Sequence, residues 1–182
     1  MTKMKMKQQI LIIVLIAAGI NPLFAESKKG PALGESVSPE EIAKWDISVF
    51  PDGEGLPNGE GSVSDGEKIY QQQCIACHGK NGLGATADQL AGAQMALSSE
   101  YPEQTIGTYW PYATTVFDVI RRSMPMTNPG SLSNEQTYAV TAYLLYLNNL
   151  IGKDEVMNAS TLTKVKMPNE DGFINIYQET KK

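Results

Sequence analysis

The sequence predicts an all-α fold, in which one helical domain carries an extended arm before it and a tail after it. Two segments, Ser64 to Glu67 (SDGE) and Ser133 to Gln136 (SNEQ), match the capping-box pattern that begins helices. From each box onward residues recur at helical spacing, as Gly66 and Tyr70 do one turn apart. Beyond residue 25, no stretch alternates strongly enough between apolar and polar residues to predict a sheet.

We expect four parts along the 182 residues: a signal peptide over 1–25, an extended acidic arm over 26–63, the helical domain over 64–150, and a C-terminal tail over 151–182 that packs on the domain. The first part has three lysines, an apolar run of eleven residues from Ile10 to Ile20, and Ala25 at its end. This pattern is typical of a cleaved secretory signal. A retained membrane anchor is the alternative, but the run is shorter than the roughly twenty residues that span a bilayer. We therefore expect a periplasmic protein without a membrane anchor.

The charge of the chain excludes one class of partner. The net charge is -5, and it becomes -8 once Lys3, Lys5 and Lys7 leave with the signal peptide. Nucleic-acid binding normally needs a basic face, so we expect no nucleic-acid partner. Nine acidic residues and a single lysine lie between Glu35 and Glu67, where glycine and proline are also frequent. This arm is either a solvated wrap over the domain or a docking arm for a basic partner surface.

The only histidine of the chain directly follows its only two cysteines, in the string Cys74, Ile75, Ala76, Cys77, His78. The C-x-x-C-H spacing is the attachment signature of c-type haem. One helical turn sets the two thiols beneath the two vinyl groups of a porphyrin, and the next residue places an imidazole against the iron. A thioredoxin-like redox pair does not need the histidine, and a zinc knuckle needs soft ligands that the chain lacks. The sequence predicts one covalently attached haem c with His78 as an iron ligand.

The second axial ligand cannot be another histidine, which leaves methionine, a less usual ligand such as lysine or tyrosine, or an open site. Five methionines follow His78: Met95, Met124, Met126, Met157 and Met167. Two of them lie in a proline-bearing loop, SMPMTNPG, where Pro125 biases Met124 toward an extended backbone. Such a stiff loop suits a thioether held over iron, whereas most methionines fill gaps in a core. We expect Met124 to be the ligand, with Met126 as the alternative.

A further helix is expected after Pro111, with Val116, Phe117 and Ile120 toward the core and Arg121 and Arg122 at its end. The last predicted helix starts at the second capping box and runs to Asn149. The segment from Gly79 to Gly92 is an irregular glycine-rich loop.

The two haem propionates need donors, and four side chains near the methionine loop are candidates. Arg121 and Arg122 are the only arginines of the chain, and a bidentate guanidinium neutralises a carboxylate better than lysine does. We favour Arg122, together with the ring donors of Trp110 and Tyr112; a solvated basic helix end is the alternative for either arginine.

These residues together resemble class I cytochrome c over residues 64–150. The resemblance implies that the first and last helices cross beside the haem, with Gly66 allowing Tyr70 and its aromatic partner to approach. The family often supplies a proline whose carbonyl accepts the hydrogen bond from the iron-ligating imidazole, and Gly82 to Leu90 contains none. The sequence therefore leaves the acceptor for His78 unassigned.

Five segments, two of them outside residues 64–150, make the resemblance more specific: WDISVFPDGEGLP from Trp45, WPYAT from Trp110, RRSMP from Arg121, Tyr138 to Leu147, and MPNEDGF from Met167. They are similar to the cytochrome subunits of periplasmic sulfite dehydrogenases and of the sulfur dehydrogenase of thiosulfate oxidation. This implies a non-catalytic, single-haem electron carrier. It would accept electrons from a molybdenum-containing catalytic subunit and pass them to a downstream cytochrome or oxidase. A free shuttle for another periplasmic dehydrogenase is the alternative. From a different class, a haem ligand sensor or peroxidase would need a displaceable methionine.

Overall fold

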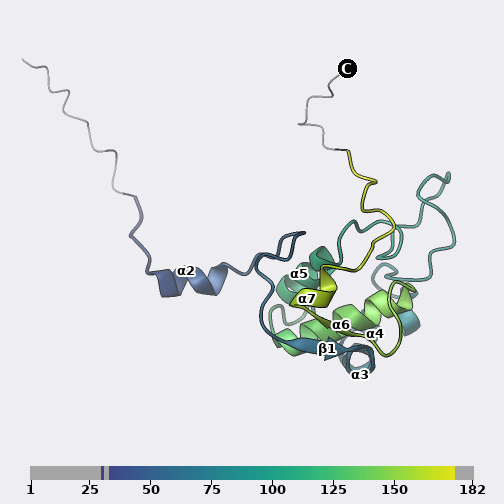
Figure 1. Cartoon of the computed structure of the whole chain (residues 1–182), viewed down its shortest axis with the longest axis horizontal. Coiled ribbons are helices and arrows are strands. Elements are labelled where there is room, and N and C mark those ends of the chain that lie inside the picture. The colour runs from purple at the N-terminus through teal and green to yellow at the C-terminus, as the bar shows by residue number, and fades with distance from the viewer. Residues whose placement is uncertain (1–29, 31–32, 175–182) are drawn as a thin grey trace, which may run out of the picture. The chain divides into compact units, whose positions relative to one another are not determined.

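The computed structural model describes residue 30 and residues 33–174 (Figure 1). The predicted signal peptide over 1–25 lies outside these residues. The contacts within the chain divide it into two units, one that ends at Glu41 and one that begins at Ile42. Helix α2, Pro39–Trp45, spans this boundary and buries none of its residues. No helix in the described part of the chain is long and apolar enough to cross a membrane.

The unit from Ile42 onward is built mainly from helices, as predicted. Its elements are β1 Glu60–Ser62, α3 Val63–Gln73, α4 Ile75–His78, a 3-10 turn Lys80–Gly82, α5 Ala113–Ser123, α6 Asn134–Leu147, β2 Val156–Asn158 and α7 Ala159–Leu162. Within this unit α6 lies centrally, with α5 and α7 on one side and β1 and α3 on the other (Figure 1).

The prediction that no sheet forms is wrong in one place. Strands β1 and β2 pair antiparallel with Gly61 opposite Met157. Each strand has three residues, which is too short for a period of two to appear in the sequence. Met157 is buried while its neighbours are not, so the pairing fixes a core side chain from the segment beyond α6.

Helix α3 begins two residues before the position that the capping box predicts. Ser62, not Ser64, is the N-cap: its backbone is extended, and its side-chain oxygen accepts a hydrogen bond of 3.1 Å from the backbone N–H of Asp65. The pattern S-x-x-D therefore begins the helix, and Ser64 lies within the first turn. The helix ends at Gln73, with Cys74 as its C-cap.

Helix α6 begins where the sequence predicts. The Ser133 hydroxyl accepts from the Gln136 backbone N–H at 3.2 Å, and the Gln136 side chain accepts from the Ser133 N–H at 2.9 Å. Every residue from Thr137 to Leu145 is buried, so this helix is surrounded on all sides. It ends at Leu147, two residues before the predicted Asn149, which has a left-handed backbone (φ +57°) and reverses the chain.

The core forms where α6 crosses α3 and α5. A Cβ at Gly66 would overlap the backbone carbonyl of Ala139, so only glycine permits this distance between α3 and α6. The rings of Tyr70 and Tyr143 then lie 5.3 Å apart at 55°. On the α5 side the rings of Phe117 and Tyr138 are 4.5 Å apart. Such tilted aromatic pairs contribute about 0.5–1.5 kcal/mol each beyond burial.

Part of the segment predicted as an arm packs against these helices. The Val49 N–H donates to the Asp118 carboxylate on α5 at 2.9 Å, and the Tyr138 hydroxyl on α6 donates to the Pro57 carbonyl at 2.9 Å. Residues beyond α6 also enter the core, where Met157, Leu162 and Met167 are buried. Segments on both flanks of the helical region thus contribute to one hydrophobic core.

Candidate haem site

The two cysteines and the histidine occupy a single helical turn. Cys74 lies between α3 and α4, and the backbone N–H of His78 donates to the Cys74 carbonyl at 2.9 Å. Both thiols are free; Cys74 is half-buried and Cys77 is exposed. Burial, with a smaller contribution from Cys77, raises the pKa of the Cys74 thiol to about 11. Without a bound group Cys74 is therefore a neutral thiol at physiological pH.

The glycine-rich loop after the motif folds back onto it. The N–H groups of Gly84 and Ala87 donate to the carbonyls of His78 and Cys77, each at 2.9 Å. This return brings the Asp88 carbonyl 3.1 Å from Nδ1 of His78. Since a carbonyl only accepts, Nδ1 carries the proton, and the lone pair of Nε2 is left for a metal. Asp88 thus supplies the acceptor that the sequence left unassigned.

Tyr70 holds Gly79, the first residue of this loop. Its hydroxyl donates to the Gly79 carbonyl at 2.9 Å, and burial raises the pKa of Tyr70 to about 12, so the hydroxyl stays a donor at physiological pH. Gly79 has φ +72°, and a Cβ there would overlap the Gly84 carbonyl. The loop after His78 therefore has this path only with glycine at position 79.

The structure separates the five candidate methionines by environment. Met157 and Met167 are buried in the core, whereas Met126 is 76% exposed and Met95 is 44% exposed. Met124 is half-buried against the core and directly follows α5, with an extended backbone (φ -119°, ψ 144°) as its following proline predicts. Met124 thus combines partial burial against the core with a place at the end of a helix, where its N–H donates to the Ile120 carbonyl at 3.1 Å.

These donors fit a haem c. Among the described residues no group of three or more histidine, cysteine or acidic side chains could hold a metal ion. Two free thiols can attach the vinyl groups of a haem, and an imidazole with Nε2 free and a thioether are the iron ligands of cytochromes c. Five half-buried apolar side chains pack against the core, as expected for residues that a porphyrin would cover. They come from the haem motif, the glycine-rich loop, the start of α5 and the methionine loop: Ile75, Leu90, Trp110, Met124 and Leu132.

Comparison with known proteins gives the same assignment. The profile of the cytochrome c family matches residues 63–148. The solved structure of the sulfane dehydrogenase SoxCD from Paracoccus pantotrophus is similar with a TM-score of 0.76 and 41% identity, over 82% of this chain and 74% of that chain. The chain belongs to the cytochrome c family. A thiosulfate dehydrogenase from Stutzerimonas stutzeri strain A1501 is 28% identical over 123 residues, which is 66% of this chain but 38% of the length of that relative.

As a cytochrome c, the protein carries one covalently bound haem c and transfers electrons. The comparisons also confirm the predicted fold class, an all-α class I cytochrome c domain. The likeness to SoxCD covers more of the chain than the family profile does, so it includes segments outside the haem domain.

The predicted propionate donors of this cytochrome lie at opposite ends of α5. Trp110 and Tyr112 are half-buried just before the helix, whereas Arg122 lies in its last turn, about 15 Å along the axis from Tyr112 at 1.5 Å per residue. Arg122 forms a bidentate pair with Asp118, at 2.8 and 3.0 Å, and Arg121 donates to the Ile47 carbonyl at 3.1 Å. The structure therefore groups Trp110 with Tyr112 and separates both from Arg122.

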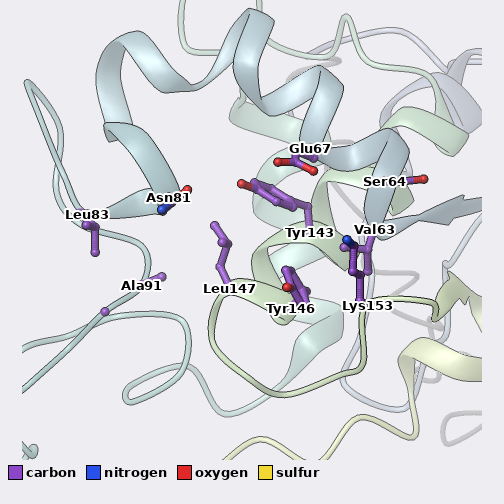
Figure 2. Close-up of a pocket in the computed structure, with 11 residues that line it drawn as sticks. Val63, Ser64, Glu67, Asn81, Leu83, Ala91, Tyr143, Tyr146, Leu147 and Lys153 are labelled. Carbon is purple, nitrogen blue, oxygen red and sulfur yellow. The ribbon is translucent and has the colours of Figure 1, made fainter.

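A cavity of about 420 Å³ lies beside the glycine-rich loop that follows the haem motif of the cytochrome (Figure 2). Its lining includes Glu67 on α3, Tyr143 and Leu147 on α6, and Leu83 and Ala91 on the loop. Figure 2 shows Tyr143 and Leu147 between α3 and that loop. None of the two cysteines, His78 and Met124 lines it, so this cavity is distinct from the site that those four residues define.

Proposed function

We propose that this cytochrome c is the electron-accepting subunit of a periplasmic sulfur-compound dehydrogenase. It would take single electrons from a molybdenum-containing sulfite or sulfur dehydrogenase subunit and pass them to a downstream cytochrome or oxidase. The observation that carries the proposal is the 41% identity with the sulfane dehydrogenase SoxCD over 82% of the chain. The likeness to a thiosulfate dehydrogenase supports the same substrate class. The lysine-led apolar segment over 1–25 supports export to the periplasm.

In this proposal Cys74 and Cys77 would form the thioether links to the haem, and His78 and Met124 would ligate its iron. Bound haem c supplies one-electron chemistry by alternating between Fe(III) and Fe(II). The chain's part is to hold both axial donors in place, His78 through the Asp88 carbonyl and Met124 through the end of α5. Two protein ligands keep small molecules off the iron, and a thioether favours the reduced state relative to a second imidazole.

We propose Trp110 and Tyr112 as donors to the haem propionates. Both are half-buried at the entry to α5, where ring N–H and hydroxyl groups can approach a carboxylate. Arg122 remains a weaker proposal for the same role, because two of its guanidinium nitrogens donate to Asp118.

The function is tested by anaerobic reduction of the purified ferric protein. A molybdenum dehydrogenase from the same gene neighbourhood, mixed with sulfite or thiosulfate, is expected to reduce the haem with one electron per protein, followed by visible absorption. Without the dehydrogenase, the sulfur compound alone should reduce it far more slowly. Equal reduction by unrelated periplasmic dehydrogenases would instead establish a free shuttle.

The half-buried, anchored Met124 argues against the ligand-sensor class, which needs a displaceable sixth ligand. An electron carrier should show the near-infrared methionine-to-iron charge-transfer band in the ferric state. It should also bind carbon monoxide poorly when reduced. Absence of the band together with rapid carbon monoxide binding would reject the carrier.

We further propose that the acidic residues before the packed segment steer the partner. Replacing Glu35, Glu40 and Glu41 with glutamine and Asp46 with asparagine is expected to slow association with the dehydrogenase roughly tenfold at low salt, because exposed charges act mainly on encounter rates. The measurement is the association rate across ionic strength. A matched variant neutralises four acidic residues elsewhere: Asp154, Glu155, Glu170 and Asp171. Equal salt dependence of the two variants would show that the acidic arm does not steer the partner.

A further inference from the structure

We propose that Asp118 is a positioning residue for the sixth iron ligand, because its carboxylate ties the last turns of α5 to the backbone of residues 47–49. The inference concerns the haem site alone and needs no electron-transfer partner. It rests on the proposed ligation by Met124, which directly follows α5.

Five residues form this connection, which we call the α5 clamp: Ile47, Val49, Asp118, Arg121 and Arg122. The Asp118 carboxylate accepts from the Val49 N–H at 2.9 Å and from Nη2 and Nε of Arg122 at 3.0 and 2.8 Å. Arg121 Nη1 donates to the Ile47 carbonyl at 3.1 Å. The clamp therefore joins α5 to a stretch about seventy residues earlier in the chain through two separate contacts.

The Asp118–Arg122 pair of the clamp is better shielded from solvent than the Asp65–Lys68 and Lys166–Glu170 pairs. The Asp118 side chain is 19% exposed and that of Arg122 is 35% exposed, against 86% and 40% for the Lys166–Glu170 pair. A bidentate guanidinium-carboxylate pair with an added backbone donor is charge-assisted and is weakened less by salt than an exposed pair. Of these three ion pairs, the one at the end of α5 is therefore the least weakened by solvent.

The clamped backbone before α5 is itself fixed. The Phe50 N–H donates to the Glu54 carbonyl at 2.9 Å, and the turn returns so closely that a Cβ at Gly55 would overlap the Ser48 carbonyl. Its far end is held by the hydrogen bond from Tyr138 to Pro57. Asp118 and Arg121 therefore fasten α5 to a rigid turn and not to a free chain.

This anchoring bears directly on Met124. The last turn of a helix frays unless its groups are held, and Arg121 and Arg122 lie three and two residues before the methionine. The Met124 N–H still makes a helical hydrogen bond, to the carbonyl of Ile120. If the contacts of the clamp break, the last turn of α5 is no longer held against residues 47–49. The Met124 thioether should then dissociate from the iron more often.

The test uses the haem-loaded protein with Asp118→Ala, Asp118→Asn and Arg121→Gln. Imidazole binding to the ferric protein reports how often the sixth ligand dissociates, and the near-infrared charge-transfer band reports ligation at rest. We expect Asp118→Ala to speed imidazole binding about tenfold or more and to weaken the band, because a charge-assisted contact is lost. Asp118→Asn keeps an acceptor for the Val49 N–H and should be intermediate. Amide exchange at Val49 should rise in the same order.

Arg121→Gln removes the guanidinium that contacts Ile47 and leaves the partners of Asp118 in place, so it keeps the inference testable if Asp118→Ala does not fold. Glu170→Gln, which breaks an exposed i,i+4 pair outside the clamp, should match the wild type. Faster Val49 exchange with unchanged imidazole binding and band would overturn the inference, since the clamp would then hold only the arm. Met124→Ala separates the two proposals: if it keeps the band, the ligand assignment itself is wrong.

Discussion

Replacing Gly66 with alanine is expected to destabilise the protein by about 3 kcal/mol or more, which lowers the melting temperature by about 10 °C for a chain of this size. The added Cβ would overlap the Ala139 carbonyl, and both groups belong to helix backbones. Alanine regains at most about 1 kcal/mol through its higher helix propensity. The steric cost of the overlap exceeds this gain in helix propensity because no flexible side chain can move aside. Helices α3 and α6 must therefore separate along their whole contact.

The consequence should also appear at the haem. Separation of α3 from α6 pulls Tyr70 away from Tyr143 and disturbs its hydrogen bond to Gly79, which shapes the loop behind His78. Thermal unfolding followed by circular dichroism and by haem absorption measures both effects. Gly152→Ala is the matched control, because a Cβ there meets only an ordinary contact with the Glu155 side chain. A Gly66→Ala protein as stable as this control would show that the helices can repack.

Local sequence signals predict the helices and the haem motif well. The Ser133 and Gln136 capping box, the apolar spacing of α5 and the C-x-x-C-H string each depend on residues within one or two turns, and the structure has all three where expected. The start of α3 shows how such a signal fails. Ser62 and Ser64 both precede an acidic residue by three positions, and the pairing of β1 with β2, some hundred residues apart, leaves Ser62 extended at the helix start.

What the sequence could not predict are contacts made by backbone groups or over long separations. The Asp88 carbonyl that holds His78 has no side-chain signature, because every residue carries such a carbonyl. The charge of Arg121 and Arg122 predicts a role at the propionates. Asp118, one turn before Arg122, meets that guanidinium, a pair that the i,i+4 spacing of a helix makes readable from the sequence. Ile47 meets Arg121 only because the fold brings residues 47–49 against α5, and no local signal predicts that contact.

Replacing Met124 with alanine is expected to change the haem more than any other substitution in the Met loop. The ferric protein should lose its near-infrared charge-transfer band, the reduced protein should bind carbon monoxide rapidly, and the midpoint potential should fall by on the order of 0.1 V, within the roughly 0.8 V that axial ligands span. The reason is that a thioether favours Fe(II), whereas water or an open position does not.

Met126→Ala is the control that decides between the two methionines of the loop. Its side chain is 76% exposed, so its loss should leave band, potential and carbon monoxide binding close to wild type. Spectroelectrochemical titration of the wild type and both variants gives the band and the midpoint potential, and mixing each reduced protein with carbon monoxide gives the binding rate. If Met126→Ala loses the band and Met124→Ala keeps it, the chain must turn at Pro125 differently once haem is bound. Loss in neither would place the sixth ligand elsewhere, and since Met157 and Met167 are buried in the core, the partly exposed Met95 would be the next to replace.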